Sequence, residues 1–365
     1  MTSRPTGPTP DRTRGRATGR TDDRAEDDPL RVLILGGTSW LGGTLARRAV
    51  DRGHQVTCLA RGESGDVPDG ARHVRADRWA SGAYQEVAGT DWDAVLDVSW
   101  QPDLVRSALT ALSTRAGIWI YVSSCSAYRD DATPDTDESA PLHEPWRGTG
   151  EVTREEYGAA KVTCEQACLA ALPADRVLIA RAGLIAGYGD RSDRFGYWPA
   201  RIAETETVAS PVLIPDSPQL SVQVIDVEDL TTWLLDCAET RTHGIFNAVG
   251  DEHSMATVLE ACARRVGRSP TWVPVPPHWL AEHDVAPWAG PESLPLWLPL
   301  PAYAGFATRR NEAARSAGLR LRPLEETIAS ALAWEQERGL TRDRKAGLTR
   351  ARETALLDLW ARTQR

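Results

Sequence analysis

The sequence lacks a long hydrophobic run. No apolar stretch reaches the roughly 18 residues that a transmembrane helix needs, and the N-terminal residues include no apolar segment of the kind found in secretory signals. Basic residues are not in excess, because 42 Lys and Arg stand against 51 Asp and Glu and give a net charge of −9. We therefore expect neither a membrane span nor a secretory signal, and the charge offers no electrostatic basis for nucleic-acid binding.

Cysteine and histidine patterns typical of metal or redox sites are also missing. The six cysteines include no C-x-x-C pair, and the histidines His278 and His283 do not form a cluster with ligand spacing. Cysteines without such spacing usually pack as small apolar side chains, and they stay reduced in a reducing compartment. We therefore expect reduced cysteines, a cytoplasmic location and no metal site.

The first 29 residues contain almost no large apolar side chain and are rich in Arg, Asp, Thr, Pro and Gly. A segment of this composition cannot bury enough apolar surface to order itself. We predict a disordered N-terminal tail at 1–29; an arm that binds a partner is the alternative.

The segment from Arg31 to Gly62 has the pattern strand, glycine-rich turn, helix, strand. Residues 31–35 are typical of a buried parallel strand, residues 41–50 have helical apolar spacing, and residues 55–59 begin a second strand. Such a unit places a helix N-terminus at the carboxyl end of the first strand, where the pyrophosphate of a dinucleotide can bind. A plain turn is the alternative. The predicted cofactor-binding residues of this turn are Gly36, Gly37, Thr38, Ser39, Trp40, Leu41 and Gly42.

Three positions give this turn its expected geometry. Gly36 allows a tight turn and Gly42 allows the helix to pack closely on the strand, whereas Ser39 replaces a glycine and makes the middle of the loop bulkier. This spacing departs from the usual G-x-G-x-x-G.

The end of the second strand indicates which dinucleotide binds. An acidic residue there would accept hydrogen bonds from the ribose 2′-hydroxyl of NAD, but the chain has Leu59, Ala60 and Arg61. Arg61 could pair with the 2′-phosphate of NADP, so we expect NADP, with NAD as the alternative; Arg61 could also be a solvated loop charge. Asp77, after the third strand, is predicted to bind the adenine amino group or to cap a helix.

Strand and helix patterns continue to alternate along the chain. Apolar runs at 73–76, 93–98 and 117–122 are predicted strands, and residues 102–112 have helical spacing. This alternation predicts an α/β fold with a doubly wound parallel sheet, in which the carboxyl ends of all strands lie on one edge.

Tyr157 and Lys161 lie four residues apart in a predicted helix, so their side chains share a face. A phenol has a pKa of about 10 and is a poor base at neutral pH, but an ammonium beside it favours the ionised form. Such a tyrosine can exchange a proton with a substrate hydroxyl or carbonyl while hydride moves to or from a nicotinamide. Lys161 could also hold the nicotinamide ribose, and Ser124, after the fifth strand, could orient the substrate oxygen. An ordinary helix-surface pair is the alternative.

Taken together, these motifs resemble those of the extended or atypical short-chain dehydrogenase/reductases, the NAD-dependent epimerase/dehydratase family, over roughly residues 30–334. The resemblance implies that Ser124, Tyr157 and Lys161 form a catalytic triad and that the family's usual homodimer is possible. It implies further that RAGLIAG follows a sixth strand and brackets the nicotinamide, and that VIDVEDL links two domains. The motifs that carry it are GGTSWLG, VSSCSAY, Tyr157 with Lys161, RAGLIAG (181–187), VIDVEDL (224–230) and GIFNAVG (244–250).

The same resemblance implies the domain organisation. We expect a Rossmann domain at 30–190 and a smaller, mixed, mainly substrate-binding domain at 191–340, with 221–250 returning to the Rossmann domain. A helix should follow at 341–365. Besides Ser39, the chain departs from the family after the fourth strand, where DVSW (97–100) puts the bulky Trp100 near the cofactor.

The loop DRSDRFGYWP (190–199) supplies the predicted substrate-binding residues. It combines Arg191, Arg194, Tyr197 and Trp198, which could bind an acidic or sugar-like small molecule through charge-assisted hydrogen bonds and stacking. In the alternative, Phe195 and Trp198 begin a helix that packs inside the small domain.

The residues after Ser124 bear on the reaction. A dehydratase of the family would have an acidic pair there, but Cys125 and Ser126 follow instead, which argues against dehydration. An NAD(P)-dependent oxidoreductase and an epimerase of a (nucleotide-)sugar-like substrate remain, since both use Tyr157 in the same way. The absence of an acidic residue beside Arg61 favours an NADP-linked oxidoreductase. A dinucleotide-binding regulator without turnover is a third hypothesis.

Overall fold

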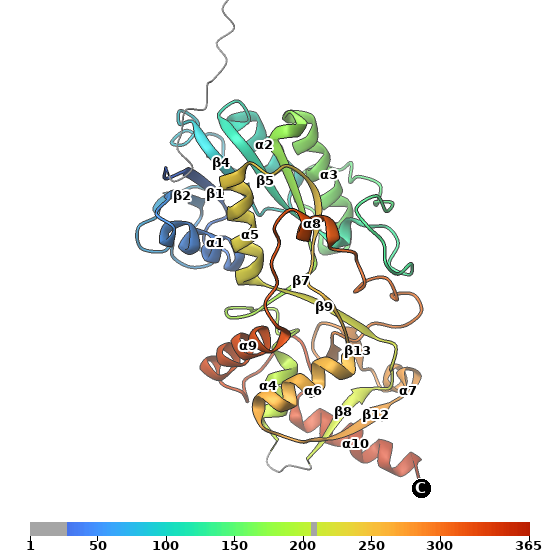
Figure 1. The fold of residues 1–365 in the computed structure, drawn as a ribbon. Coiled ribbons are helices and arrows are strands. Elements are labelled where there is room, and N and C mark those ends of the chain that lie inside the picture. Colours follow the sequence, from blue (N-terminus) through green and yellow to red (C-terminus); the bar gives the residue numbers. More distant parts are fainter. Residues whose placement is uncertain (1–27, 206–209) are drawn as a thin grey trace, which may run out of the picture.

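The computed structural model describes residues 28–205 and 210–365, so residues 1–27 of the predicted tail lie outside the described residues. Within this part of the chain, parallel strands form a seven-stranded sheet in the order β10-β6-β5-β4-β1-β2-β3 (Figure 1). This sheet confirms the predicted Rossmann fold. The strands are β1 (Arg31–Leu35), β2 (Gln55–Ala60), β3 (Arg72–Arg75), β4 (Trp92–Asp97), β5 (Ala116–Ser124), β6 (Val177–Ala182) and β10 (Gly244–Ala248).

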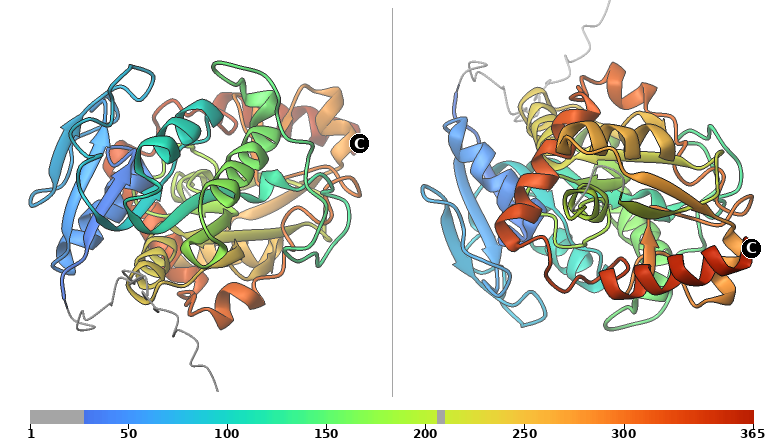
Figure 2. Two further views of the ribbon diagram at one scale, coloured as in Figure 1. Left: turned by 90° about the horizontal axis from the view of Figure 1, so that it is seen from above. Right: turned by 90° about the horizontal axis from the view of Figure 1, so that it is seen from below.

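Helices cover both faces of this sheet (Figure 2). Helices α1 and α5 pack together on one face, and α2 and α3 pack together on the other. In β1, Val32 and Ile34 belong to the first apolar layer, whereas Leu33 and Leu35 belong to the second. Burial on both faces is why the strand is aliphatic throughout. These helices are α1 (Trp40–Asp51), α2 (Pro102–Leu112), α3 (Tyr157–Ala171) and α5 (Val227–Thr240).

The winding of the sheet reverses between β1 and β4, which are hydrogen-bonded neighbours. From β1 the chain proceeds outward through β2 and β3, and it then returns to β4 on the other side and continues through β5 and β6. In open α/β sheets, ligands bind at the carboxyl ends of the strands beside such a reversal. The fold therefore places the candidate site next to the ends of β1, β4 and β5.

A small sheet connects the Rossmann domain to the second domain (Figure 1). Strand β9 of this sheet leads directly into α5 and β10, so the chain returns from the link to the central sheet. This is the place that the family resemblance gives to VIDVEDL. The linking strands are β7 (Leu184–Ala186), β9 (Ser221–Asp226) and β11 (Glu252–Ser254).

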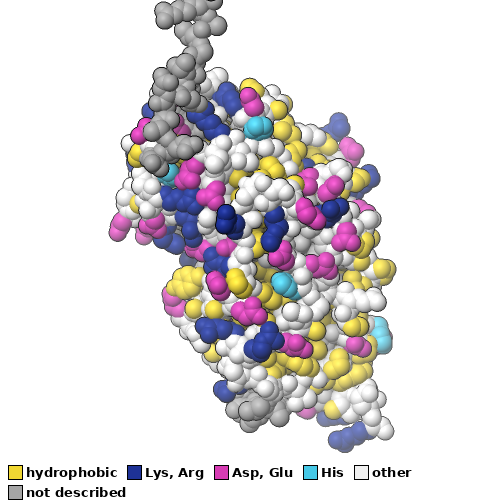
Figure 3. Space-filling model, in the orientation of Figure 1, with side chains coloured by type: hydrophobic (Ala, Val, Ile, Leu, Met, Phe, Trp, Pro, Cys, Tyr) yellow, Lys and Arg dark blue, Asp and Glu magenta, His cyan; other side chains and the backbone are white. Residues whose placement is uncertain are grey.

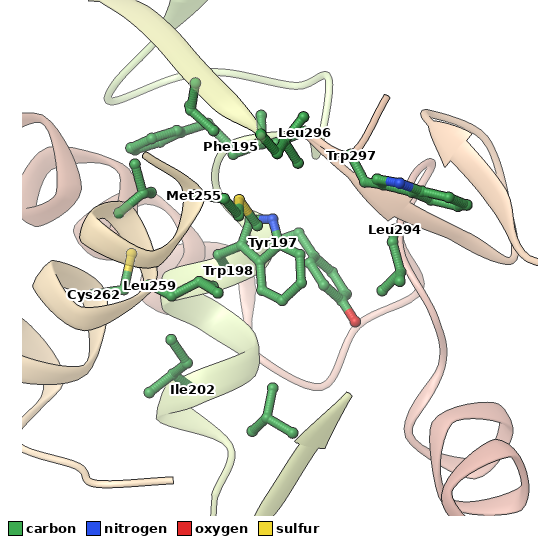
Figure 4. Packing of buried hydrophobic residues seen from close by; sticks show 14 of the residues in the cluster. Phe195, Tyr197, Trp198, Ile202, Met255, Leu259, Cys262, Leu294, Leu296 and Trp297 are labelled. Atoms are coloured by element: carbon green, nitrogen blue, oxygen red, sulfur yellow. The ribbon is translucent and has the colours of Figure 1, made fainter. Parts of the chain in front are cut away.

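The second domain has its own apolar core, which Figure 4 shows from close by. Helices α4, α6 and α9 pack against one another, and α10 contacts β8 at the far end. Its elements are α4 (Tyr197–Ala203), β8 (Pro211–Pro215), α6 (Met255–Val266), β12 (Thr271–Val275), α7 (Pro277–Glu282), β13 (Ala286–Trp288), β14 (Ser293–Pro295), α9 (Leu324–Arg338) and α10 (Arg350–Thr363).

One segment departs from the predicted boundaries. Helix α8 (Glu312–Ser316) packs against β10, and Ala314 and Leu319 belong to the apolar layer beneath α1 and α5. Part of the range assigned to the substrate domain therefore completes the Rossmann domain, because its apolar residues cover the edge of the central sheet.

Basic and acidic side chains are interspersed over the face of the molecule shown in Figure 3. All six cysteines are buried and unpaired. Within the described ranges, no helix is long and apolar enough to cross a membrane.

Asp226 caps the start of α5 from inside the link between the domains. Its Oδ1 accepts a hydrogen bond from the Glu228 N–H at 2.9 Å, and burial raises its pKa to about 6 even though Arg322 lies 3.5 Å away. Since this pKa exceeds the unfolded value of about 3.9, the folded state favours the protonated acid. The contribution of Asp226 to stability is thus complete below pH 4 and is lost as the pH rises toward 6.

We expect Asp226→Asn to become progressively more stable than the parent protein between pH 4 and pH 7, by up to roughly 3 kcal/mol. Asparagine caps helices as well as aspartate does, so the cap is retained while the buried charge is removed. Denaturant unfolding at several pH values measures the difference, with Asp103→Asn as the control, because Asp103 lies in the first turn of α2 but is only half-buried. A difference that does not vary with pH would contradict the assignment.

Candidate active site

Two adjoining cavities follow the edge where the strands end. The first has a volume of about 730 Å³ and lies between the Rossmann domain and the second domain. The second, of about 490 Å³, lies over the ends of β1 and β2. Val98 and Trp100 line both cavities, so the two adjoin at these residues and together make up one cleft.

The glycine turn has the geometry that its spacing predicts. Gly36 has a φ of +97°, which favours glycine, and a Cβ there would lie 2.8 Å from Val98. A Cβ on Gly42 would lie 2.2 Å from the Gly36 carbonyl oxygen. The turn can therefore bring α1 close to β1 only with glycine at both positions.

Ser39, which replaces a family glycine, caps α1. Its hydroxyl donates to the Gly36 carbonyl at 2.8 Å and accepts from the Gly42 N–H at 3.2 Å. The N–H groups of Trp40 and Leu41 precede the first intrahelical bond and have no acceptor within the helix. These two groups therefore remain for an anionic ligand at the positive end of α1.

The predicted adenosine-side residues, Arg61 and Asp77, both line the second cavity. Arg61 is exposed and pairs with Glu63 at 3.1 Å. Asp77 accepts a hydrogen bond from the Trp79 N–H at 3.0 Å, so it caps a local turn while it borders the cavity. Arg78, also in this cavity, makes two hydrogen bonds to the buried Asp97. Arg61 is thus the cation with an exposed side chain among the residues around this cavity.

Ser124, Tyr157 and Lys161 come together at the first cavity. Tyr157 begins α3, and Lys161 follows one turn later with its nitrogen 5.8 Å from the centre of the Tyr157 ring. The buried Lys161 ammonium donates to the carbonyls of Ser99 and Val122 at 3.1 and 2.6 Å. An ammonium has three N–H donors, so one remains for a ligand. The helix therefore places a phenol and a fixed positive charge beside the end of β5.

The Ser124 hydroxyl lies at the end of β5 and accepts a hydrogen bond from the Ser126 N–H at 3.1 Å. Ser126 continues the short turn after the strand and also lines the first cavity. Trp100 packs edge-on against the Tyr157 ring, with ring centres 5.4 Å apart. The departure at DVSW thus puts a large ring where the two cavities adjoin, in contact with the predicted proton-transfer residue.

A buried polar network that the motifs did not reveal lies behind these residues. Glu165, on the inner face of α3, accepts hydrogen bonds from Arg181 of β6 at 2.8 to 3.3 Å and from the hydroxyl of Ser123 in β5. Arg181 also donates to the Tyr128 hydroxyl at 3.0 Å. The sequence signal was a charged residue on the apolar face of a helix together with an arginine inside an apolar strand. Each of these elements carries or adjoins a cavity residue, so the network fixes their relative positions.

The predicted substrate loop divides between the cavity and the core. Arg191 and Arg194 line the first cavity, but Tyr197 and Trp198 are buried in the second domain (Figure 4). The Trp198 ring donates to the Pro295 carbonyl at 2.8 Å, and Tyr197 packs beneath Gly347. The prediction that Tyr197 and Trp198 bind substrate is therefore wrong: they begin α4 and face its core.

Distant segments contribute further residues to the first cavity. Arg154 precedes Tyr157 in the short turn before α3. Trp288 and Phe306 belong to the second domain and pack edge-on, with ring centres 5.0 Å apart. Among residues 28–205 and 210–365, no group of three or more His, Cys, Asp or Glu side chains is arranged to hold a metal ion.

Known proteins resemble this chain in sequence and in fold. Residues 103–248 match the profile of the NAD dependent epimerase/dehydratase family, which confirms the resemblance seen in the motifs. A 2′-dehydrokanamycin reductase of Streptomyces kanamyceticus is 29% identical over 272 residues, which cover 71% of this chain and 73% of that protein. An epimerase family protein of Bos taurus is 26% identical over 274 residues, covering 68% and 84%. A UDP-glucuronic acid 4-epimerase from Bacillus cereus, in complex with NAD, shares the fold with a TM-score of 0.61 at 13% identity, covering 84% and 99%.

Proposed function

We propose that this chain, of which residues 103–248 match the NAD dependent epimerase/dehydratase family, is an NADP-linked oxidoreductase that interconverts a hydroxyl and a carbonyl group on a small molecule. The observation that carries this proposal is the convergence of Ser124, Tyr157 and Lys161 on a cavity that adjoins the glycine turn. The reductase of Streptomyces kanamyceticus, at 29% identity, supports the same type of reaction.

The cleft fits a nicotinamide dinucleotide. The close approach at Gly36 and Gly42 and the N–H groups of Trp40 and Leu41 suit a pyrophosphate. The second cavity, with Arg61 and Asp77, would hold the adenosine half, and the first would hold the nicotinamide half beside Lys161. When bound, the nicotinamide supplies the acceptor or donor of hydride.

The chain's own residues then handle the proton. In the direction of oxidation, hydride leaves the substrate carbon and the phenolate of Tyr157 takes the hydroxyl proton; in reduction, the phenol returns it to the carbonyl oxygen. The Ser124 hydroxyl hydrogen-bonds to the same substrate oxygen. Lys161, held by two backbone carbonyls, stabilises the negative charge on the phenolate through its own positive charge, 5.8 Å from the ring centre.

The first cavity has too few acidic groups for dehydration. Among the described residues that line it, Asp190 is the one carboxylic acid, and its oxygens accept hydrogen bonds from the Ser192 N–H and hydroxyl at 2.7 and 3.0 Å. It is therefore engaged in shaping its own loop. Removal of water would need a separate acid and base beside the substrate carbon.

An epimerase could use the same three residues but would have to return the hydride to its own intermediate, so it would retain its cofactor. We expect the purified protein to release no stoichiometric NAD on denaturation and to bind NADPH more tightly than NADH. Mass analysis of the released nucleotide and fluorescence titration measure these properties. Stoichiometric NAD would favour the epimerase.

The preference for NADPH should depend on Arg61. We expect Arg61→Ala to weaken NADPH binding about tenfold or more and NADH binding by less than twofold, because only NADPH offers a 2′-phosphate for a charge-assisted hydrogen bond. Arg72→Ala is the matched control, since Arg72 is similarly exposed and similarly paired, with Glu86, but lies outside both cavities. Equal losses for the two nucleotides would refute the 2′-phosphate contact.

A further inference from the structure

Three arginines line the first cavity without carboxylate partners. Arg154, Arg191 and Arg194 form no ion pair within the described part of the chain, although the chain has a net charge of −9. In the neighbouring cavity, by contrast, Arg61 and Arg78 are both paired. Arg154 comes from the turn before α3, whereas the other two come from the loop after β7. Two domains therefore direct unpaired positive charge at the same space.

Arg194 is the most firmly positioned of the three. Its guanidinium carbon lies 5.1 Å from the centre of the Trp288 ring, which in turn packs against Phe306. Trp288 has a φ of +69°, a strained conformation for a bulky residue that persists only where the surrounding structure enforces it. This backbone conformation is part of how the second domain presents the indole ring to Arg194.

The loop that carries Arg194 is anchored from behind. The buried Asp193 pairs with Arg338 at 2.9 Å and accepts a hydrogen bond from the Lys345 N–H at 2.8 Å. The Trp334 ring donates to the Asp190 carbonyl at 2.7 Å. These contacts hold the loop to α9 and the segment after it. The backbone that carries Arg194 is thus positioned before any ligand arrives, which lowers the entropic cost of binding.

The environment of Arg194 leaves its charge only partly compensated. The pKa of Arg194 is lowered, chiefly because burial disfavours its positive charge. Asp190 and Tyr157 nearby raise this pKa, whereas the positive charge of Arg154 lowers it further. Contact with an aromatic face offsets part of the cost of removing a guanidinium from water. No carboxylate lies within ion-pair distance of Arg194 among residues 28–205 and 210–365. A ligand anion would supply the missing partner in the same cavity as Tyr157.

We propose that the substrate carries an anionic group, a carboxylate or a phosphate, which binds Arg194 between Trp288 and Arg154, with Arg191 beside it in the same loop. The planar guanidinium matches two oxygens of either anion with parallel hydrogen bonds. This inference rests on the proposed function, because it takes Tyr157 to be the group that faces the reacting carbon. It makes Arg194 a residue that selects anionic over neutral substrates.

Calorimetric titration tests the anion site without knowledge of the substrate. The protein is saturated with NADP⁺, so that the dinucleotide's own phosphate sites are occupied, and is titrated with malonate and, separately, with inorganic phosphate. We expect one or both probes to bind at one site per chain and Arg194→Gln to weaken that binding about tenfold or more. Binding of malonate alone identifies a carboxylate site, and binding of phosphate alone identifies a phosphate site.

Arg265→Gln provides the matched control, because Arg265 is exposed in the last turn of α6 and lies outside both cavities. It should bind the probes within twofold of the parent protein, and both variants should unfold at the same temperature as the parent. Failure of both anions to bind, or equal binding by Arg194→Gln, would overturn the proposal. If NADP⁺ itself does not bind, the proposed function fails separately, while titration of the nucleotide-free protein and Arg194→Gln still reports on the anion site.

Discussion

Tyr157→Phe should lower kcat by about 10² to 10⁴ while the dissociation constant for NADPH changes by less than threefold. Phenylalanine keeps the ring that packs against Trp100 and lies beside Lys161, so the walls of the cleft are preserved. Only the oxygen that exchanges a proton with substrate is removed. Turnover is followed by the loss of nicotinamide absorbance with a carbonyl compound found by screening, and cofactor binding by fluorescence titration.

Tyr303→Phe is a matched control for this experiment. Tyr303 is part of the second domain, is 38% exposed and lies outside the first cavity. Its variant should turn over substrate at the parent rate. Undiminished turnover by Tyr157→Phe would eliminate the enzyme assignment as stated. If Tyr157→Phe instead left the protein's biological activity unchanged and no turnover were found in the parent, the protein would be a dinucleotide-binding regulator.

Glu165→Ala should lower the free energy of unfolding by about 3 to 5 kcal/mol. Glu165 is 2% exposed and holds the buried guanidinium of Arg181 with several hydrogen bonds. Its removal leaves a charge inside the protein with only the Tyr128 hydroxyl and a backbone carbonyl as partners. Because the network joins α3 to β5 and β6, the variant should also have a lower kcat, through displacement of Tyr157 from Ser124. Denaturant unfolding and steady-state kinetics measure the two effects.

Glu86→Ala serves as the control for charge removal, since the Glu86 pair with Arg72 is exposed and such pairs contribute about 1 kcal/mol or less. Glu165→Gln, which keeps the shape and part of the hydrogen bonding, should fall between the parent and Glu165→Ala. A cost for Glu165→Ala no greater than that for Glu86→Ala would show that the network does not stabilise the junction of these three elements.

The parts of the fold that depend on near neighbours in the chain could be predicted from the sequence. The strand from Arg31, the positive φ at Gly36 and the close approach at Gly42 all follow from the local pattern. The shared face of Tyr157 and Lys161 follows from the pitch of a helix. The order of these motifs was enough to predict a doubly wound sheet, because short connections and right-handed crossovers leave few alternatives.

Ser39 shows where a local motif was insufficient. Its identity predicted a bulkier loop, but only the structure showed that the hydroxyl binds both the Gly36 carbonyl and the Gly42 N–H. The substrate loop was more ambiguous still. Arg194 and Trp198 are four residues apart in one polar and aromatic segment, and the sequence alone does not decide which of them faces a cavity and which a core.

The sequence by itself determined the Rossmann sheet, its glycine turn and the presence of a Tyr–Lys pair, since turn conformation and helical periodicity are set by residues close together in the chain. Only the tertiary structure decided which side chains share the cleft. Arg194 meets Trp288, and Trp198 donates to Pro295, across separations of more than 90 residues. Such contacts depend on how the second domain packs against itself and against the Rossmann domain. No local periodicity encodes them, because each is fixed by the burial of apolar surface that distant segments achieve together.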